Sequence, residues 1–272
     1  MPSPSRPSAA EIKNIALKHG AASCGIAAAC DINEYQRFIA ASKDVPPGLS
    51  YLGRAPALRV NIKNWFGPAR SALVCAFQYW HSGLDHDEVL KKAGKGGGKV
   101  SRYALVPDYH KVIRRKLKEI LAGIKEIYPD ADGKVFVDTS PVMEKELGRL
   151  AGLGFRGKNT LLISKELGSY FFIGGVALNL DAATDSLSRN SGADCGDCRR
   201  CIDACPTGAL SEPGILDPRL CVSYWTTQSK EKMSDELQSR SGGLTYGCDL
   251  CQESCPHNNK TQNKLLKEFN ER

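Results

Sequence analysis

The chain has 272 residues, of which 37 are Lys or Arg, 30 are Asp or Glu and 11 are Cys. This length is about twice that of a typical domain, so we expect more than one folded unit. The N-terminus has no apolar leader core and no stretch is apolar over the length of a membrane span. We therefore expect a protein of the reducing cytoplasm, neither membrane-bound nor secreted with disulfides.

The first part of the chain predicts a mixed α/β domain over residues 11–182, preceded by a flexible tail at residues 1–10. Ser8 or the residues after it can cap a helix over EIKNIALKHG, residues 11–20. The apolar, β-rich stretch SALVCAFQYW at 71–80 predicts a buried strand.

Positive charge is concentrated in residues 91–118, which contain ten Lys or Arg and one acid, Asp108. Residues 91–99 are glycine-rich and predict a loop, whereas the stretch from His110 to Tyr128 has the apolar spacing of an amphipathic helix. On charge alone, a solvated helix face is the simpler interpretation. A polyanionic partner such as RNA is the more specific one, because clustered Lys and Arg dominate affinity for phosphate backbones.

A second strand, KVFVDTS at 134–140, is expected to stop at Asp138. Ser140 and Pro141 have the residue types of an N-cap and a first helical position, so we expect a helix over residues 142–153.

The glycine-rich stretch at 152–164 leads into an apolar segment at 168–180. Its aromatic-rich halves around Gly174 and Gly175 predict a strand with a bend. The small and polar residues of 183–194 are expected to link this domain to the next one.

Asp138 is the residue of the first domain best placed for acid–base chemistry, because α/β folds bind ligands at the ends of strands. From the pattern alone, a cap of the following turn is the more common role of such an Asp. Lys158 and Asn159 could contact a phosphate or fill a turn, and His110 has no partner pattern of a metal ligand. The chain has no G-x-x-x-x-G-K-[ST] loop and no G-x-G-x-x-G after a strand.

Residues 195–260 contain two cysteine runs, CGDCRRCIDACP and CDLCQESCP. Three thiolates at i, i+3 and i+6 can hold three irons of one 4Fe–4S cubane, while a fourth cysteine followed by proline turns to the other cluster. The second run offers two cysteines before its outlying one, so its cluster needs Cys221. We therefore expect one cluster on Cys195, Cys198, Cys201 and Cys255, and the other on Cys205, Cys221, Cys248 and Cys251.

A zinc ribbon is the alternative, since two C-x-x-C knuckles also describe that site. It explains neither the third cysteine of the first run nor the proline after Cys205 and Cys255. The other cysteines, Cys24, Cys30 and Cys75, lie in apolar sequence and are expected to be small buried side chains without a chemical role.

Several blocks of the chain resemble, in order and spacing, the epoxyqueuosine reductases of the queuosine tRNA-modification pathway. They are SRYALVPDYHKVIRRKL, VDTSPVMEKELGRLAGLGFRGKNTLLIS, GSYFFIGG and the two cysteine runs with CVSYWTT between them, and together they cover roughly residues 50–260. The resemblance implies a cobalamin-binding domain similar to that of reductive dehalogenases, fused to a two-cluster ferredoxin-like domain. It also implies reduction of epoxyqueuosine at the tRNA wobble position. We further expect an external low-potential electron donor and a monomer.

By motif, Asp138 matches the family's proton donor above the cobalt. Further contacts to the corrinoid fall on Lys145, Leu162, Ile173, Ser223, Cys248 and Asp249. Asp108 and His110 imitate the start of the D-x-H-x-x-G signature, but Ile113 stands where that signature needs glycine. The resemblance therefore implies cobalamin bound in its base-off form, without a protein histidine on cobalt.

Two departures from the family bear on the substrate. Typical members carry a helical repeat segment after the cluster domain, whereas residues 261–272 suffice for a short helix or tail, which implies a short form with a reduced grip on tRNA. His257 also replaces the family's aromatic residue after the last cysteine–proline pair. A cobalamin and iron–sulfur reductase of a small molecule is the first alternative, and a non-catalytic electron-transfer protein is the second.

Overall fold

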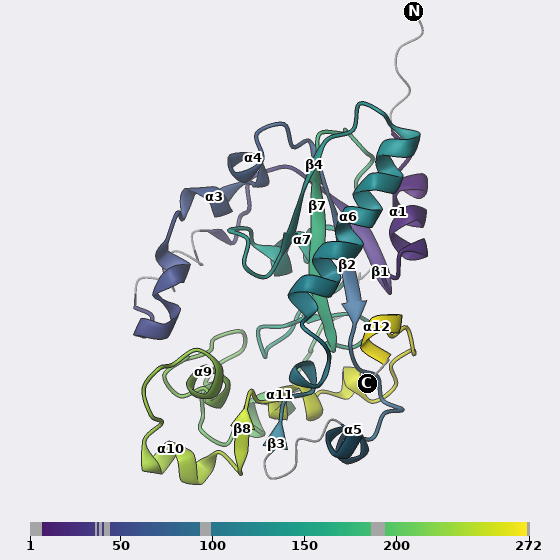
Figure 1. Ribbon diagram of the computed structural model, residues 1–272. Coiled ribbons are helices and arrows are strands. Elements are labelled where there is room, and N and C mark those ends of the chain that lie inside the picture. The colour runs from purple at the N-terminus through teal and green to yellow at the C-terminus, as the bar shows by residue number, and fades with distance from the viewer. Residues whose placement is uncertain are drawn as a thin grey trace, which may run out of the picture.

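The computed structural model describes residues 7–35, 37, 40, 44–92, 99–185 and 194–270. Its centre is a four-stranded sheet in the order β1-β2-β7-β4, in which every neighbouring pair is antiparallel (Figure 1). The strands are β1 (Ser23–Ala28), β2 (Ser71–Gln78), β4 (Gly133–Val137) and β7 (Phe171–Leu178). The strands expected at 71–80 and before Asp138 are thus confirmed.

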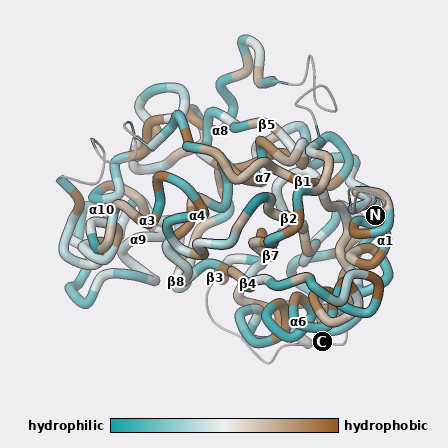
Figure 2. The backbone as a smooth tube through the Cα atoms, turned by 90° about the horizontal axis from the view of Figure 1, so that it is seen from above, coloured by the Kyte–Doolittle hydropathy of each residue, from teal (hydrophilic) through white to brown (hydrophobic). Residues whose placement is uncertain are grey.

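Helices cover both faces of this sheet. α1 (Ala9–Lys18) and α6 (Tyr109–Ile127) pack on one face, and α7 (Glu144–Leu150) packs on the other (Figure 2). β2 is buried along its whole length because both of its faces are covered. The amphipathic helix expected from His110 onward is confirmed, and its fully buried stripe consists of Ile113, Leu117, Ile120 and Ile124.

The first helix begins earlier than expected. Ser8 caps α1, and its Oγ accepts a hydrogen bond from the Glu11 amide at 3.4 Å. The Ser8 amide in turn donates to the Tyr128 hydroxyl at 2.9 Å. Residues 9 and 10 are therefore helical rather than part of a tail, while residues 1–6 lie outside the described residues.

The bend expected at Gly174 and Gly175 is wrong, because β7 pairs without a break with both of its neighbours there. A Cβ built on Gly175 would lie 2.3 Å from the Leu73 carbonyl oxygen and 2.4 Å from the Phe136 ring. These positions need glycine because neighbouring groups approach the strand closely.

The helix start expected at Ser140 and Pro141 is also wrong. These residues form a turn, in which the Val142 amide donates to the Ser140 carbonyl at 2.8 Å. α7 begins at Glu144 and has no side-chain cap. The reason is Asp138, whose φ of 45° turns the chain out of β4 before a helix can begin.

Short elements complete the fold. Before α6 they are η1 (Pro47–Gly53), α3 (Ala57–Val60), α4 (Ile62–Trp65), α5 (His86–Lys92), β3 (Lys99–Val100) and η2 (Arg102–Leu105). A hairpin of β5 (Phe155–Arg156) and β6 (Leu162–Ile163) follows α7. The cysteine-rich part contains α8 (Arg200–Asp203), α9 (Val222–Thr227), α10 (Asp235–Arg240), β8 (Leu244–Tyr246), α11 (Leu250–Glu253) and η4 (Pro256–Asn258), and α12 (Lys267–Asn270) ends the described chain.

The cysteine-rich part is tied to the first domain through buried polar contacts. β8 pairs in parallel with β3, and the Asp249 carboxylate accepts from the Ser101 hydroxyl at 2.6 Å and the Arg102 amide at 2.7 Å. The residues after the clusters return to the sheet, where the Phe269 side chain is fully buried. The short C-terminal helix is therefore part of the first domain's core.

The remaining cysteines divide in two ways. Cys24 and Cys75 are buried as expected and lie opposite each other on β1 and β2, but Cys30 is exposed. The expectation for Cys30 was wrong because its segment leaves the sheet after β1. Among the described residues, no helix has the length and apolar character needed to cross a membrane.

Candidate functional site

The first predicted set of cluster ligands surrounds one cavity. Its lining includes Cys195, Cys198, Cys201 and Cys255, together with Lys158, Asn159 and Ile163 from the segment around β6. The Cys195 sulfur accepts the Lys158 amide at 3.5 Å, and the Lys158 ammonium donates to the Gly196 carbonyl at 2.6 Å. Asn159 donates from its side chain to the Cys251 carbonyl at 3.3 Å. Lys158 and Asn159 thus hold the cysteine loops in this structure.

The cysteines of the second predicted set also lie near one another, because their charges affect one another's pKa. Burial raises the pKa of Cys248 to about 11, with further contributions from Cys221, Asp249 and Cys205. Burial likewise raises the pKa of Cys251, followed by the charges of Cys248 and Cys221. Buried thiols that oppose one another's ionisation in this way become thiolates readily only when a metal centre takes up their charge.

Backbone amides point at these sulfurs. Burial raises the pKa of Cys221 against hydrogen bonds from the amides of Tyr224 and Ser223, at the start of α9. Burial raises the pKa of Cys205, but amides including that of Leu210 lower it by more, so the pKa lies below its ordinary value. Amide donors around sulfur are the surroundings that iron–sulfur clusters use to set their potentials.

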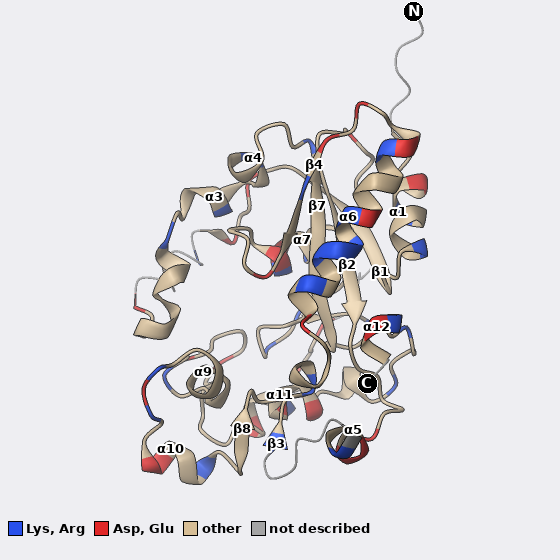
Figure 3. Cartoon of the chain, viewed as in Figure 1, with Lys and Arg blue, Asp and Glu red and all other residues tan. Residues whose placement is uncertain are grey.

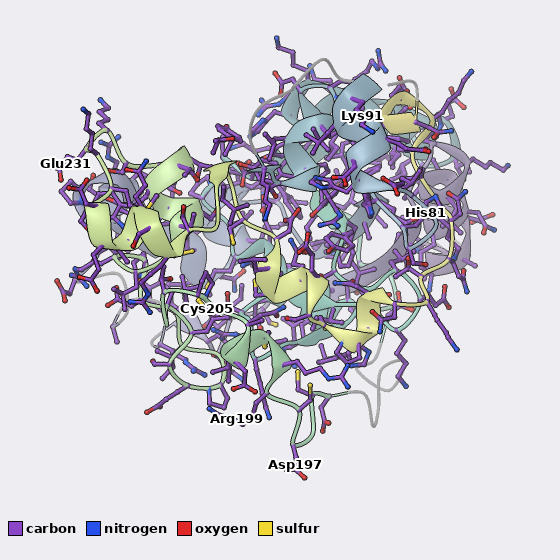
Figure 4. All side chains as sticks on the ribbon, turned by 90° about the horizontal axis from the view of Figure 1, so that it is seen from below. His81, Lys91, Asp197, Arg199, Cys205 and Glu231 are labelled. Carbon is purple, nitrogen blue, oxygen red and sulfur yellow. The ribbon has the colours of Figure 1, made fainter. Side chains whose placement is uncertain are left out.

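The two cysteine runs lie on the lower side of the molecule (Figure 4). Asp197 projects at the tip of the first cysteine loop, near Arg199, while Cys205 lies further inside. Within the described residues, no three His, Cys, Asp or Glu side chains gather tightly enough for a single metal ion.

Asp138 stands at the end of β4 and is held by the first turn of α6. Its Oδ2 accepts from the Tyr109 hydroxyl at 3.1 Å and lies 2.9 Å from His110 Nε2. The other ring nitrogen of His110 lies 3.2 Å from Asp108 Oδ1, so both contacts are hydrogen bonds when both nitrogens carry protons. Burial, and next the charge of Asp138, raise the pKa of Tyr109 well above its ordinary value, so Tyr109 keeps its proton as a donor.

The Asp138 side chain remains 55% exposed despite these contacts. Its left-handed backbone is a conformation that Asp adopts more readily than most residues. Sequence reasoning missed Tyr109 and His110 as partners of Asp138 because they lie on another element, with no local motif to connect them.

Glu144 and Lys145 begin α7 behind Asp138. Burial, and then the charge of Asp138, raise the pKa of Glu144 to about 8. The surrounding protein desolvates the Lys145 ammonium and so lowers its pKa, and Arg156 adds to this effect. Lys145 is nevertheless exposed to solvent. Charge coupling of Lys145 to both Asp138 and Cys251 places these three groups around one region.

The other predicted contacts are placed as follows. Leu162 and Ile173 meet at Gly148 of α7, where Leu162 is buried and Ile173 is partly exposed. Ser223 is partly exposed on α9. Asp249 is 4% exposed and is occupied by its contacts to Ser101, Arg102 and Gln252.

Comparison with known proteins matches two parts of the chain. Residues 59–139 match the family model of epoxyqueuosine reductase QueG (DUF1730), and residues 194–258 match the model of a 4Fe–4S double cluster binding domain. An epoxyqueuosine reductase of Cyclobacterium marinum is 35% identical over 250 residues, which are 91% of this chain and 78% of the relative. The chain belongs to the epoxyqueuosine reductase family.

Two solved structures place this family in a wider fold group. An epoxyqueuosine reductase crystallised with a tRNA-Tyr epoxyqueuosine-modified stem loop matches with a TM-score of 0.79 at 28% identity, over 96% of this chain and 68% of that chain. A reductive dehalogenase described with a B12-dependent mechanism matches with a TM-score of 0.55 at 17% identity, over 99% of this chain and 34% of that chain, and shows the same fold. The expected fold class, the oxidoreductase class and the double-cluster domain are thereby confirmed.

Proposed function

We propose that this chain reduces epoxyqueuosine to queuosine at the wobble position of a tRNA anticodon. The observation that carries the proposal is the position of Asp138, a half-exposed carboxyl held by Tyr109 and His110 and coupled through Lys145 to Cys251 of the cluster domain. An acid next to a source of electrons is what removal of an epoxide oxygen requires. The structure of a relative with an epoxyqueuosine-modified tRNA stem loop supports tRNA as the substrate.

The reaction consumes two electrons and two protons and releases the epoxide oxygen as water. Clusters on the two cysteine sets would carry electrons one at a time from an external low-potential donor. Asp138 would deliver protons to the departing oxygen, while Tyr109 and His110 fix its carboxyl at the end of β4. This division of labour accounts for the fusion of an acid-bearing α/β domain to an electron-transfer domain.

We propose that cobalamin binds against the surface around Asp138. Lys145 is accessible yet desolvated, and Oε1 of Glu144 is buried without a hydrogen-bond partner among the described residues, so both lie where protein surrounds an open region. Of the predicted contacts, Asp138, Lys145, Ile173, Ser223 and Cys248 are accessible to a bound corrinoid, whereas Leu162 and Asp249 would act from beneath the surface. When bound, the corrinoid supplies reduced cobalt as a nucleophile toward carbon. Both ring nitrogens of His110 already face carboxylates, in keeping with base-off binding.

The tRNA would meet the α6 side of the molecule, where Lys and Arg gather (Figure 3). Arg115 and Lys116 are paired with Glu268 at 3.0 and 2.9 Å, so part of this charge is used internally. Arg114 and Lys118 are exposed and make no ion pair within the described part of the chain, which leaves them for phosphate groups. The glycine-rich residues 93–98 of the basic segment lie outside the described residues. We also propose that the protein is a monomer of the cytoplasm.

One experiment tests the function directly. The protein, with clusters reconstituted anaerobically and cobalamin added, is given a chemical reductant and tRNA that carries epoxyqueuosine, and the nucleosides are analysed by mass spectrometry. We expect conversion to queuosine with the tRNA, and little with the free nucleoside. Equal conversion of the free nucleoside would favour the small-molecule reductase, and none with either would favour the electron-transfer protein.

A separate measurement tests cofactor binding. Electron paramagnetic resonance of Co(II) cobalamin should change to a base-off signal when the protein is added. An unchanged signal would exclude the corrinoid site.

A further inference from the structure

Glu144 is a partly buried carboxyl beside Asp138 to which the proposed function gives no proton-transfer role. Its Oε1 atom is buried and has no hydrogen-bond partner among the described residues. The Asp138 backbone amide acts on the same carboxyl, because as a donor it lowers the pKa of Glu144 against the larger effects of burial and the Asp138 charge. Glu144 is therefore close to the acid's own peptide group, while its Oε1 has no donor among the described residues.

Glu146, two residues later on the same helix, shows how this chain treats an ordinary buried carboxylate. Arg149 donates from Nε to both of its oxygens at 3.0 Å, and from Nη2 to its Oε1 at 2.5 Å. No comparable cation is paired with Glu144 within the described residues, since Lys145 donates instead to the Thr160 carbonyl at 3.2 Å. A carboxylate that is buried without a cation is costly, and a bound proton removes that cost.

The titratable groups that face Glu144 come from three elements. Asp138 belongs to the loop after β4, Tyr109 to α6 and Lys145 to α7 itself. Burial and the charge of Asp138 both raise the pKa of Glu144, to about 8, against the opposing charge of Lys145. Tyr109 donates to Asp138, and the charge of Glu144 also contributes to the raised pKa of Tyr109. Tyr109 is therefore close to both carboxyls.

We propose that Glu144 is a protonated carboxylic acid that holds one proton of the reaction and passes it to Asp138. This inference rests on the proposed reduction and specifies where that proton is stored. The epoxide takes up two electrons from the external donor through the clusters and two protons, its carbon–oxygen bonds break, and an alkene and water are formed. Glu144 passes its proton to the Asp138 carboxylate, which gives it to the departing oxygen, and the second proton enters from solvent through the same two carboxyls. Solvent then reprotonates Glu144.

The decisive variant is Glu144→Gln, which keeps the shape and an acceptor for the Asp138 amide but has no proton to release. Infrared spectra are recorded at neutral pH on protein that contains clusters but no cobalamin, with glutamate labelled by ¹³C. The wild type should show the stretch of a protonated glutamic acid. Glu144→Gln should lack this band, and the control Glu146→Gln, which removes the paired carboxylate, should retain it. A Glu144→Gln spectrum that keeps the wild-type band would overturn the proposal.

Turnover provides the second readout. The wild-type rate should fall as pH rises through about 8, where Glu144 loses its proton. Glu144→Gln should be slower by about 10²-fold at neutral pH, the low end for a positioned proton donor, and should lack this fall. A Glu144→Gln enzyme with wild-type rate and pH profile would refute the proton-storage role. Because the infrared band needs neither substrate nor cobalamin, it decides the protonation of Glu144 even if the chain does not reduce epoxyqueuosine.

Discussion

Nε2 of His110 lies 2.9 Å from Oδ2 of Asp138, although the two residues are 28 positions apart in the chain. The contact joins the first turn of α6 to the end of β4. Because Tyr109 donates to the same oxygen, Oδ1 of Asp138 is not engaged by either of these two residues. The packing of α6 on the sheet thereby fixes the orientation of the proposed acid.

Asp138→Asn should abolish most activity without loss of the fold. Asn tolerates the left-handed backbone at this position and can still accept from Tyr109, but it has no proton to give. We expect turnover to fall by about 10²–10⁴-fold while cluster content and cobalamin binding are kept. The matched control is Asp130→Asn, an exposed acid before the start of β4. Unchanged turnover in Asp138→Asn would leave Asp138 as a cap of its turn.

Iron analysis tests the cluster assignment. The reconstituted protein should contain about eight irons and eight sulfides, two cubanes, with no stoichiometric zinc. Cys221→Ala should lose one cluster and keep the other, because the remaining thiols near Cys248 and Cys251 cannot complete the set. The exposed Cys30→Ala serves as control and should keep both. Full iron in Cys221→Ala would show that the pairing is wrong.

Gly175→Ala tests the packing of β7. Its added Cβ would lie 2.3 Å from the Leu73 carbonyl oxygen, a backbone atom that the ladder holds in place. We expect the free energy of unfolding to fall by about 1–3 kcal/mol or more, measured as a lower denaturant midpoint of the cluster-loaded protein. Gly53→Ala, where an added Cβ meets nothing within 4 Å, should leave the midpoint unchanged.

Patterns with a local cause could be predicted from the sequence. The stripe of α6, the buried strand β2 and the Ser8 cap follow from residue spacing and side-chain chemistry that act over a few positions. Spacing alone also limits which thiols can share a cubane, and the two cysteine sets that it indicates stay a prediction.

Features that depend on tertiary contacts could not be predicted in this way. Gly174 and Gly175 read as a bend because nothing nearby in the chain reveals Leu73 and Phe136, which approach them across the sheet. Ser140 and Pro141 have good capping chemistry, but the left-handed turn at Asp138 delays the helix to Glu144. The burial of Glu144 likewise comes from the assembled fold and leaves no mark on the local sequence.

Stability against pH should report the Glu144 proton. Its pKa in the folded chain, about 8, lies above its ordinary value of 4.5, so between these values the folded state holds a proton that the unfolded chain releases. The contribution of Glu144 to the free energy of unfolding is therefore complete below pH 4.5. It falls by about 1.4 kcal/mol per pH unit as the pH rises toward about 8. Relative to Glu146→Gln, denaturant titrations of Glu144→Gln should show a correspondingly weaker loss of stability with rising pH. Parallel pH profiles of the two variants would contradict the shifted pKa.

The last prediction concerns the binding of tRNA by the basic face of α6. Neutralising Lys111, Arg114, Arg115 and Lys118 should weaken tRNA binding and flatten its salt dependence, by about 0.7–0.9 of log–log slope for each lost phosphate contact. The structure divides this set, because Arg115 is paired with Glu268 and Lys111 lies 3.6 Å from Asp108, whereas Arg114 and Lys118 have no such pair within the described residues.

The double variant Arg114→Gln and Lys118→Gln should therefore produce most of the flattening. Arg115→Gln should instead loosen the contact between α6 and α12, seen as faster hydrogen exchange near Phe269, with little change in the salt slope. Lys125→Gln is the matched control, since Lys125 lies about three turns further along the same helix and pairs with Asp132. An unchanged slope in the Arg114 and Lys118 variant would mean that this face is only solvated, and would favour a substrate without a phosphate backbone.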